Sequence, residues 1–351
     1  MENILFNNIN LQLFADVQTT VMSDLSAEMK TFYDMTLIDE AQANLVHDQF
    51  GQKRPIPANG GKTIEFRKFV SLEKATTPLT EGVTPPGKSL KVTAETATVS
   101  QYGDFITQSD VLELTALDNT ILEATKLLGR QAGLTLDTVV RNVLNSGTNV
   151  TYCPKIGTGG AETAVTSRKN LDATAQLTVK VIQQVVAKLR GQNTPTIGGK
   201  YVAIIHPYVA YDLMRDPEWI DAHKYANPTN LYEGEIGEIA GVRFVQTTEA
   251  KIWKGAGADA DEDKSNDSTP EGLAVFSTLF LGDGAYGVTE ITGGGLQTIV
   301  KQKGSAGTAD PLDQRSSVGW KAIKTAKILI PNYLVRVESC SAAFSATTAA
   351  N

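Results

Sequence analysis

The sequence predicts an α+β fold in which one long helix lies between two strand-rich regions. Three observations predict it: a sustained helical period over residues 120–144, two-residue alternation in segments on either side, and a continuous apolar run at residues 201–206. The spacing of apolar residues distinguishes helices from strands, because side chains share a face every three to four residues in a helix and every two in a strand.

The predicted helix Thr120–Leu144 is the longest periodic segment. Its apolar positions recur at steps of three and four: Ile121, Ala124, Leu128, Ala132, Leu136, Val139 and Val143. The sequence Asn145-Ser146-Gly147 predicts its end, with the glycine as a left-handed C-cap. Gly129 and Gly133 lie inside the helix, where each costs roughly 1 kcal/mol relative to alanine. We interpret them as a point of close backbone approach, with simple tolerance as the alternative.

Before this helix, the sequence predicts a helix over residues 26–50 and three alternating strands, at 62–69, 90–99 and 102–107. Between the first two strands, residues 76–87 are dense in proline and glycine and poor in apolar side chains. Connections this long are unusual in a compact hairpin and are often functional. One interpretation is a plain surface loop; the other is a two-stranded arm that lies on another subunit, since an isolated ribbon is only marginally stable in water.

After the long helix, the sequence mixes helices and strands. Two further helices are predicted, at 178–189 and 208–215. The predicted strands are 201–206, which reads as a buried strand, and 242–247, 273–281, 287–291, 296–302, 316–330 and 333–338. Residues 341–351 are small and polar and are predicted to fray.

Composition narrows the class of protein. The chain has 351 residues, a net charge of -7 and 41% hydrophobic residues, which predict a folded protein of about two domains without a basic face for nucleic acid. Cys153 and Cys340 fit neither a disulfide framework nor a C-x-x-C metal site. The chain has no apolar segment long enough for a membrane span and no signal-peptide pattern at its start, so we expect synthesis in the cytoplasm.

No motif for catalysis, cofactor binding or metal binding is complete. No glycine-rich phosphate loop is present. Asp259, Asp261 and Asp263 imitate the start of a calcium-binding loop, but Lys264 stands where that loop needs glycine and Pro270 where it needs glutamate. The histidines, at positions 47, 206 and 223, form no metal motif, and His206 is expected to be structural. The sequence therefore predicts a protein that is not an enzyme and binds no cofactor or metal.

Three stretches carry a resemblance to a known family. They are Gly60-Gly61-Lys62-Thr63-Ile64-Glu65-Phe66-Arg67-Lys68-Phe69 with residues 78–85, His206-Pro207 with Asp212-Leu213, and Asp310-Pro311-Leu312-Asp313-Gln314 with Val318-Gly319-Trp320-Lys321 and Ile328-Leu329. In this order and spacing the chain resembles, from about residue 25 to 338, the major capsid proteins of tailed bacteriophages, in particular the family typified by coliphage N-four.

The resemblance implies a Hong Kong-97-type capsid fold. Its expected parts are an N-terminal arm at 1–59, an extended loop at 60–103, a peripheral domain at 104–169 that carries the long helix, an axial domain at 170–292, and a return of the peripheral domain with the C-terminal tail at 293–351. It also favours the arm interpretation of residues 76–87, with Thr80, Glu81, Gly82 and Pro85 in contact with a neighbouring subunit.

The implied function is a major capsid protein that self-assembles into the icosahedral shell around the double-stranded DNA of a tailed phage. Expected partners are copies of itself in hexamers and pentamers, with scaffold, portal and decoration proteins as further partners; DNA is enclosed without sequence-specific binding, and no membrane is involved. The protein is expected in the virion after synthesis in the host cytoplasm. Two alternatives are the shell protein of an encapsulin-like compartment and a hydrolase with its site in residues 170–292.

Overall fold

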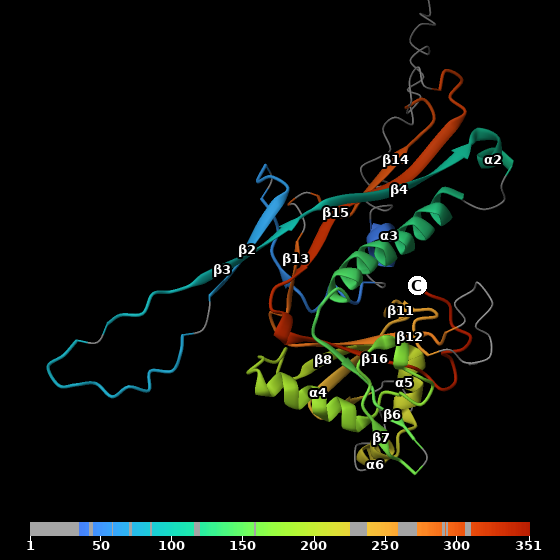
Figure 1. Ribbon diagram of the computed structural model, residues 1–351. Coiled ribbons are helices and arrows are strands. Elements are labelled where there is room, and N and C mark those ends of the chain that lie inside the picture. The colour runs from blue at the N-terminus through green and yellow to red at the C-terminus, as the bar shows by residue number, and fades with distance from the viewer. Residues whose placement is uncertain are drawn as a thin grey trace, which may run out of the picture. The chain divides into compact units, whose positions relative to one another are not determined.

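The computed structural model of the chain contains a mixed seven-stranded sheet (Figure 1). The larger cluster of buried apolar side chains includes residues of this sheet. Its strands run in the order β5-β16-β12-β8-β10-β9, with β11 paired to β12 outside this path. Their bounds are β5 Val150–Tyr152, β8 Tyr201–Ile205, β9 Glu238–Ile239, β10 Val242–Gln246, β11 Ile252–Trp253, β12 Val275–Leu281 and β16 Leu334–Ser339. Strands β8 and β12 are antiparallel neighbours, and every residue of both is buried, as the apolar run at 201–206 predicted for β8.

The structure describes residues 35–41, 45–57, 59–69, 72–84, 86–115, 120–157, 159–224, 237–258, 272–289, 292, 294–305 and 310–351. The chain divides into two compact units. The first contains Met1–Ala41, Gly103–Ala132 and Leu296–Lys321, and the second contains Gln42–Tyr102, Gly133–Gly295 and Ala322–Asn351. The seven-stranded sheet lies wholly in the second unit.

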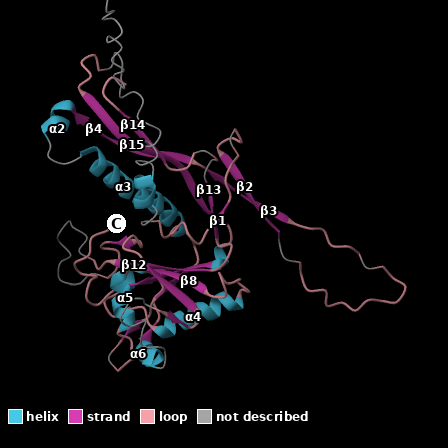
Figure 2. Cartoon of the chain, turned by 180° about the vertical axis from the view of Figure 1, so that it is seen from behind, coloured by secondary structure: helices cyan, strands magenta, loops and turns pink. Residues whose placement is uncertain are grey.

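Three helices of the second unit accompany this sheet, and Figure 2 shows them in cyan: α4 Val179–Gly191, α5 Pro207–Met214 and α6 Pro217–Lys224. Helix α4 begins where the Thr178 side chain accepts a hydrogen bond from the Val181 amide, an ordinary N-cap. Val181, Val185 and Leu189, predicted as one face, are all buried. Helices α4 and α5 were predicted, whereas α6 was not.

The remaining elements complete the two units. Their bounds are β1 Gln52–Lys53, β2 Thr63–Phe69, β3 Val92–Thr98, β4 Ser100–Ser109, α2 Asp110–Thr115, β6 Lys155–Ile156, β7 Glu162–Thr163, η2 Arg168–Asn170, β13 Tyr286–Thr289, β14 Gln297–Lys301, β15 Arg315–Ile328 and η4 Pro331–Tyr333. Strand β15 pairs with β14 near its start and with β13 at its end, both antiparallel. The strands predicted in the tail are therefore confirmed as β14, β15 and β16.

Helix α3 spans Thr120–Leu144, the bounds that the sequence predicted. Gly129 lies at a close approach: a Cβ built on it would be 2.9 Å from the Leu37 carbonyl oxygen and 3.1 Å from Glu40 Cβ. Both distances are shorter than ordinary van der Waals contact, so an alanine would displace the segment at 35–41. The close-approach interpretation of Gly129 is confirmed.

Three local predictions were wrong. Of the helix predicted over 26–50, residues 35–41 are helical and 26–34 and 42–44 lie outside the described residues. Residues 45–50 are not helical: 47–50 form a turn, and the Asp137 carboxylate binds the amides of Val46 and His47. Gly147 is not among the glycines with positive φ; it leaves room for packing, since a Cβ there would lie 3.3 Å from Ile328 Cδ1 and from Leu334 Cδ2.

The third wrong prediction concerns the tail. Residues 341–351 do not fray, because their side chains bind the backbone of the second unit. Ser345 donates to the Ala274 carbonyl at 2.8 Å. Asn351 accepts from the Ile252 amide at 2.9 Å and donates to the Ala250 carbonyl at 2.8 Å. The small polar side chains that led to the prediction of a frayed tail are the groups that attach the tail to the second unit.

The two-residue turn between β9 and β10 places an alanine in a strained backbone conformation, which a substitution can test. Ile239 and Val242 pair across the β9–β10 hairpin, and the intervening Ala240 and Gly241 have φ of 54° and 79°, as a type I′ turn requires. Alanine in this region is strained by roughly 1 kcal/mol or more. We predict that Ala240→Gly raises the free energy of unfolding by about 1 kcal/mol in chemical denaturation.

The control is Ala187→Gly, at an exposed helical position of α4, which should lower the free energy of unfolding by about 1 kcal/mol. A loss of stability in both variants would contradict the assignment of strain to Ala240.

Candidate assembly interface

The second unit carries a hairpin built from β2 and β3. The strands pair antiparallel in continuous register from Thr63↔Thr98 to Phe69↔Val92. Period-two alternation places Ile64 and Phe66 on one face, and Phe66 is 3% exposed. The opposite face, which includes Glu65 and Arg67, is exposed. The amphipathic strands predicted from the sequence therefore form one ribbon whose base is attached to the unit on a single face.

Beyond the strands, the connection forms an open curve, drawn in cyan in Figure 1. Every residue of its described ranges, 72–84 and 86–91, is exposed. We call residues 72–91 the arm. At its turn the Val83 amide donates to the Thr80 carbonyl at 3.2 Å, and Gly82 has a φ of 78°. This combination is the signature of a type II turn, in which glycine supplies the left-handed residue.

The predicted contact residues are partly accounted for. Thr80, Glu81 and Gly82 lie in this turn and are exposed. A Cβ built on Gly82 would meet no atom within 4 Å, so its conformation, and not crowding, favours glycine there. Pro85 lies outside the described residues. The structure thus brings three of the four together at the turn of the arm.

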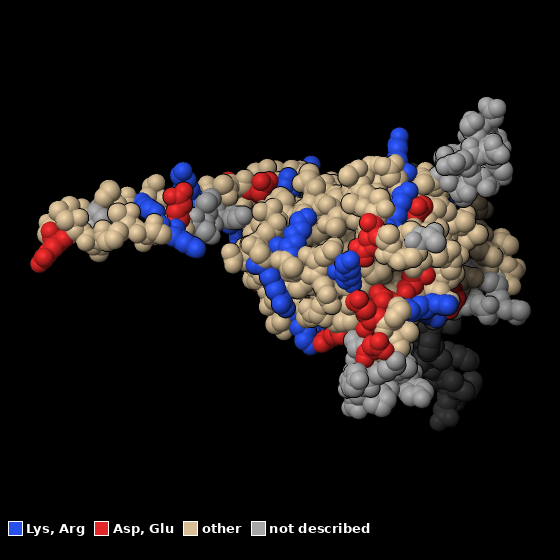
Figure 3. All heavy atoms as spheres, turned by 60° about the horizontal axis from the view of Figure 1, so that its bottom comes forward, with Lys and Arg blue, Asp and Glu red and all other residues tan. Residues whose placement is uncertain are grey.

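The arm also exposes large apolar side chains, which the sequence analysis had described as sparse. Their exposed fractions are 60% for Leu72, 78% for Leu79, 63% for Val83 and 63% for Leu90. In Figure 3 the arm is the extension at the left, and most of its atoms are neither acidic nor basic. Exposed apolar side chains that are grouped together mark interaction sites in soluble proteins. The signal was visible in the sequence, but periodicity could not find it because the arm has no regular structure.

A second group of exposed apolar side chains lies in the first unit, on β4 and α2. Phe105 is 67% exposed and Val111 63% exposed, with Ile106 and Leu112 beside them in sequence. Strand β4 pairs with β15, and among the described residues no strand pairs with its other edge. This face therefore has the character of a contact surface as well.

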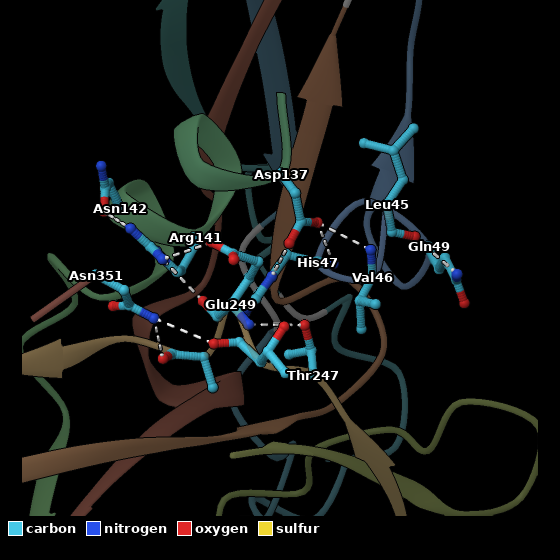
Figure 4. A network of polar contacts seen from close by, with 12 residues as sticks. Leu45, Val46, His47, Gln49, Asp137, Arg141, Asn142, Thr247, Glu249 and Asn351 are labelled. Carbon is cyan, nitrogen blue, oxygen red and sulfur yellow. Dashed lines mark hydrogen bonds and ion pairs between the residues drawn. The ribbon is translucent and has the colours of Figure 1, made fainter. Parts of the chain in front are cut away.

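A buried polar network holds the segment that leads into the hairpin (Figure 4). The Asp137 carboxylate on α3 accepts from the amides of Val46 and His47 at 2.9 and 2.7 Å and pairs with His47 Nδ1 at 2.6 Å. His47 and Asp137 are both 0% exposed. Tyr286 donates its hydroxyl to the His47 carbonyl, and burial raises the pKa of Tyr286. Sequence reasoning missed this network because its members are separated by about 90 residues or more.

His206 has the structural role that was predicted for it. Its Nδ1 accepts from the Tyr208 amide at 3.1 Å, so it caps α5. Burial lowers the pKa of His206 to about 4, which keeps the imidazole neutral and able to accept. Asp259, Asp261 and Asp263 lie outside the described residues. Within the part of the chain that is described, no cluster of His, Cys, Asp and Glu is arranged to hold a metal ion, and no helix has the length and hydropathy of a membrane span.

A long helix, two strand-rich units and an arm with exposed apolar side chains define a subunit of an assembly, whose function lies in its contacts. Similarity to known proteins identifies the kind of assembly. Residues 92–307 match the family model described as phage capsid protein, which is more than half of the chain. The chain belongs to this phage capsid protein family. It is a capsid protein that forms the shell of the virion, in a family of structural proteins.

Solved capsids support the fold. The chain is similar to the capsid protein of cyanophage P-SCSP1u, with 14% identity and a TM-score of 0.62 over 85% of this chain and 88% of that one. The capsid of Ralstonia phage GP4 matches with 14% identity and a TM-score of 0.62, over 84% and 88%. The capsid of Helicobacter pylori bacteriophage KHP30 matches with 14% identity and a TM-score of 0.55, over 97% and 99%. The Hong Kong-97-type fold is therefore confirmed. None of the curated proteins matches the sequence.

The His206 cap predicts a pH dependence of stability. The pKa of this histidine is about 4 in the folded chain against 6.5 without burial, so the unfolded chain binds the proton first. Stability contributed by the neutral imidazole is complete above pH 6.5 and falls as the pH drops towards 4, by up to about 3 kcal/mol. The expected result is a larger loss of stability between pH 6.5 and 4 in the natural chain than in His206→Asn.

Asparagine keeps an acceptor at the N-cap but does not titrate, so the comparison removes the contribution of every other group. Thermal unfolding measured at half-unit pH steps gives the two curves. Parallel curves for the two proteins would show that His206 is not the titrating cap.

Proposed function

We propose that this capsid protein assembles as hexamers and pentamers into an icosahedral shell that encloses the double-stranded DNA of a tailed phage. We further propose that the arm of each copy lies on a neighbouring copy. The parts implied by the sequence resemblance then have roles: the extended loop at 60–103 joins subunits, and the axial domain at 170–292 meets its copies around each capsomer centre. The seven-stranded sheet includes β5 and β16 from outside 170–292, so the proposed axial domain takes two strands from its neighbours in sequence.

The observation that carries the arm proposal is the exposure of Leu79 and Val83. Burying a leucine or valine side chain from water is worth roughly 1.5–3 kcal/mol. A subunit with an extended, apolar arm therefore gains free energy when another surface covers it. One such contact is modest, but a closed shell repeats it in every copy, so weak contacts add up to a stable assembly.

Charge supports enclosure of DNA without adhesion to it. The net charge of -7 opposes general attraction to phosphate. A shell with this charge retains the genome because it is closed around the DNA and not because it binds the phosphates. Scaffold, portal and decoration proteins are further proposed partners.

A double substitution tests the role of the arm. In Leu79→Ser/Val83→Ser the free energy of unfolding of the unassembled subunit should change by less than about 0.5 kcal/mol, because both side chains are exposed. The yield of closed shells should fall at least tenfold. Sedimentation of the assembly reaction and negative-stain electron microscopy measure the yield.

The matched control is Leu312→Ser, which removes an equally exposed leucine, at 74%, from outside the arm. It should leave the yield within about twofold of the natural chain, a change of less than about 0.5 kcal/mol. Closed shells at the natural yield from the arm variant would refute the proposed contact.

A further inference from the structure

The hairpin that carries the arm packs on strands β13 and β15 of the second unit through two cross-strand pairs. In the hairpin, Phe66 lies opposite Glu95. In the sheet beneath it, Gly287 of β13 lies opposite Lys327 of β15. Phe66 packs on Gly287, while Lys327 Nζ lies 3.6 Å from Glu95 Oε2. The Phe66–Glu95 pair of the hairpin thus packs on the Gly287–Lys327 pair of the sheet. Phe66 and Gly287 make the apolar contact, and Glu95 and Lys327 make the ion pair.

The apolar side of this contact has no spare room. A Cβ built on Gly287 would lie 2.5 Å from Phe66 Cε1 and 2.7 Å from Phe66 Cζ. Real Cβ atoms do not approach other atoms so closely, so the ring occupies the space that any other residue at position 287 would need. Gly287 is not among the residues with positive φ. The position therefore requires glycine for its lack of a side chain and not for its backbone conformation.

The ion pair between Lys327 and Glu95 contributes less to stability than the contact between Phe66 and Gly287. The side chains of Lys327 and Glu95 are 42% and 51% exposed, and exposed ion pairs contribute little to stability. Phe66, in contrast, is 3% exposed although the next described residues along the arm are all exposed. Within the described part of the hairpin, Phe66 is the last buried side chain before the arm begins.

We propose that Phe66 and Gly287 form a pivot that fixes the direction in which the arm leaves the subunit, and that closure of the shell requires this direction. The proposal rests on the proposed function, because it assigns the arm a target on another copy. Leu79 lies 13 positions beyond Phe66, so the tip is up to about 40 Å from the pivot. A tilt of about 10° at the base would move the tip by roughly 7 Å, more than the length of a side chain.

Gly287→Ala tests the pivot. The added methyl must displace the Phe66 ring, so the yield of closed shells should fall at least tenfold. The control is Gly191→Ala, at the end of α4, where a Cβ would meet no atom within 4 Å and φ is not positive. The control should assemble within twofold of the natural yield.

A second measurement separates direction from stability. A spin label at Leu79→Cys and another at Ala187→Cys, both within the second unit, report the distribution of tip-to-body distances in the unassembled subunit. Gly287→Ala should shift or broaden this distribution, whereas a purely structural role would leave it unchanged in the folded fraction. If Gly287→Ala does not fold, Phe66→Leu takes its place, because leucine keeps the site apolar but loses the flat ring that fits the glycine.

The outcomes distinguish the pivot from the function on which it rests. A folded Gly287→Ala or Phe66→Leu variant that assembles at the natural yield overturns the pivot, and so does an unchanged distance distribution. The proposed function fails separately, if Leu79→Ser/Val83→Ser assembles normally. Failure of assembly in the serine variant together with normal assembly of Gly287→Ala would refute the pivot alone.

Discussion

The exposure of large apolar side chains along the arm is the constraint on which the rest of the account depends. Leu72, Leu79, Val83 and Leu90 lie on a segment without regular structure, and each is at least 60% exposed. Such a segment is unfavourable in water and has no packed core of its own. We propose that the arm is covered in an assembly, where a neighbouring copy supplies the missing surface. Because the chain belongs to the phage capsid protein family, we propose that the neighbour is another copy of the same chain.

The proposed contact with a neighbour requires that the arm be held firmly by its own subunit. The second unit does this with buried groups from distant parts of the chain. Asp137 on α3 binds the backbone at Val46 and His47, in the segment that precedes β1 and the hairpin, and Phe66 packs the base of the hairpin on Gly287. Leaving a buried polar group without its hydrogen-bond partner costs about 1–3 kcal/mol, so the Asp137 site is a firm support. Rigid attachment of the hairpin reduces the conformational entropy that assembly would otherwise lose.

Local signals in the sequence predicted most of the fold. The period over Thr120–Leu144 gave the bounds of α3, and alternation gave β2, β3 and the strands of the tail, because these patterns reflect one buried face of one element. The wrong predictions involve partners far away in sequence. The helix predicted to residue 50 is absent at 45–50, where Asp137 binds the amides of Val46 and His47, and the tail is ordered because Asn351 binds the backbone about 100 residues before it. The pivot was also invisible, since nothing near Gly287 in sequence shows that Phe66 covers it.

The central claim is that assembly covers the arm, and the labelling rate of a single thiol tests it most directly. Cys153 and Cys340 are buried, and burial raises the pKa of both thiols, that of Cys340 to about 12, so neither competes at neutral pH. A thiol introduced by Leu79→Cys is then the reactive group. Its rate of labelling should fall at least tenfold when subunits assemble into shells. An equal rate in free subunits and in closed shells would contradict the account.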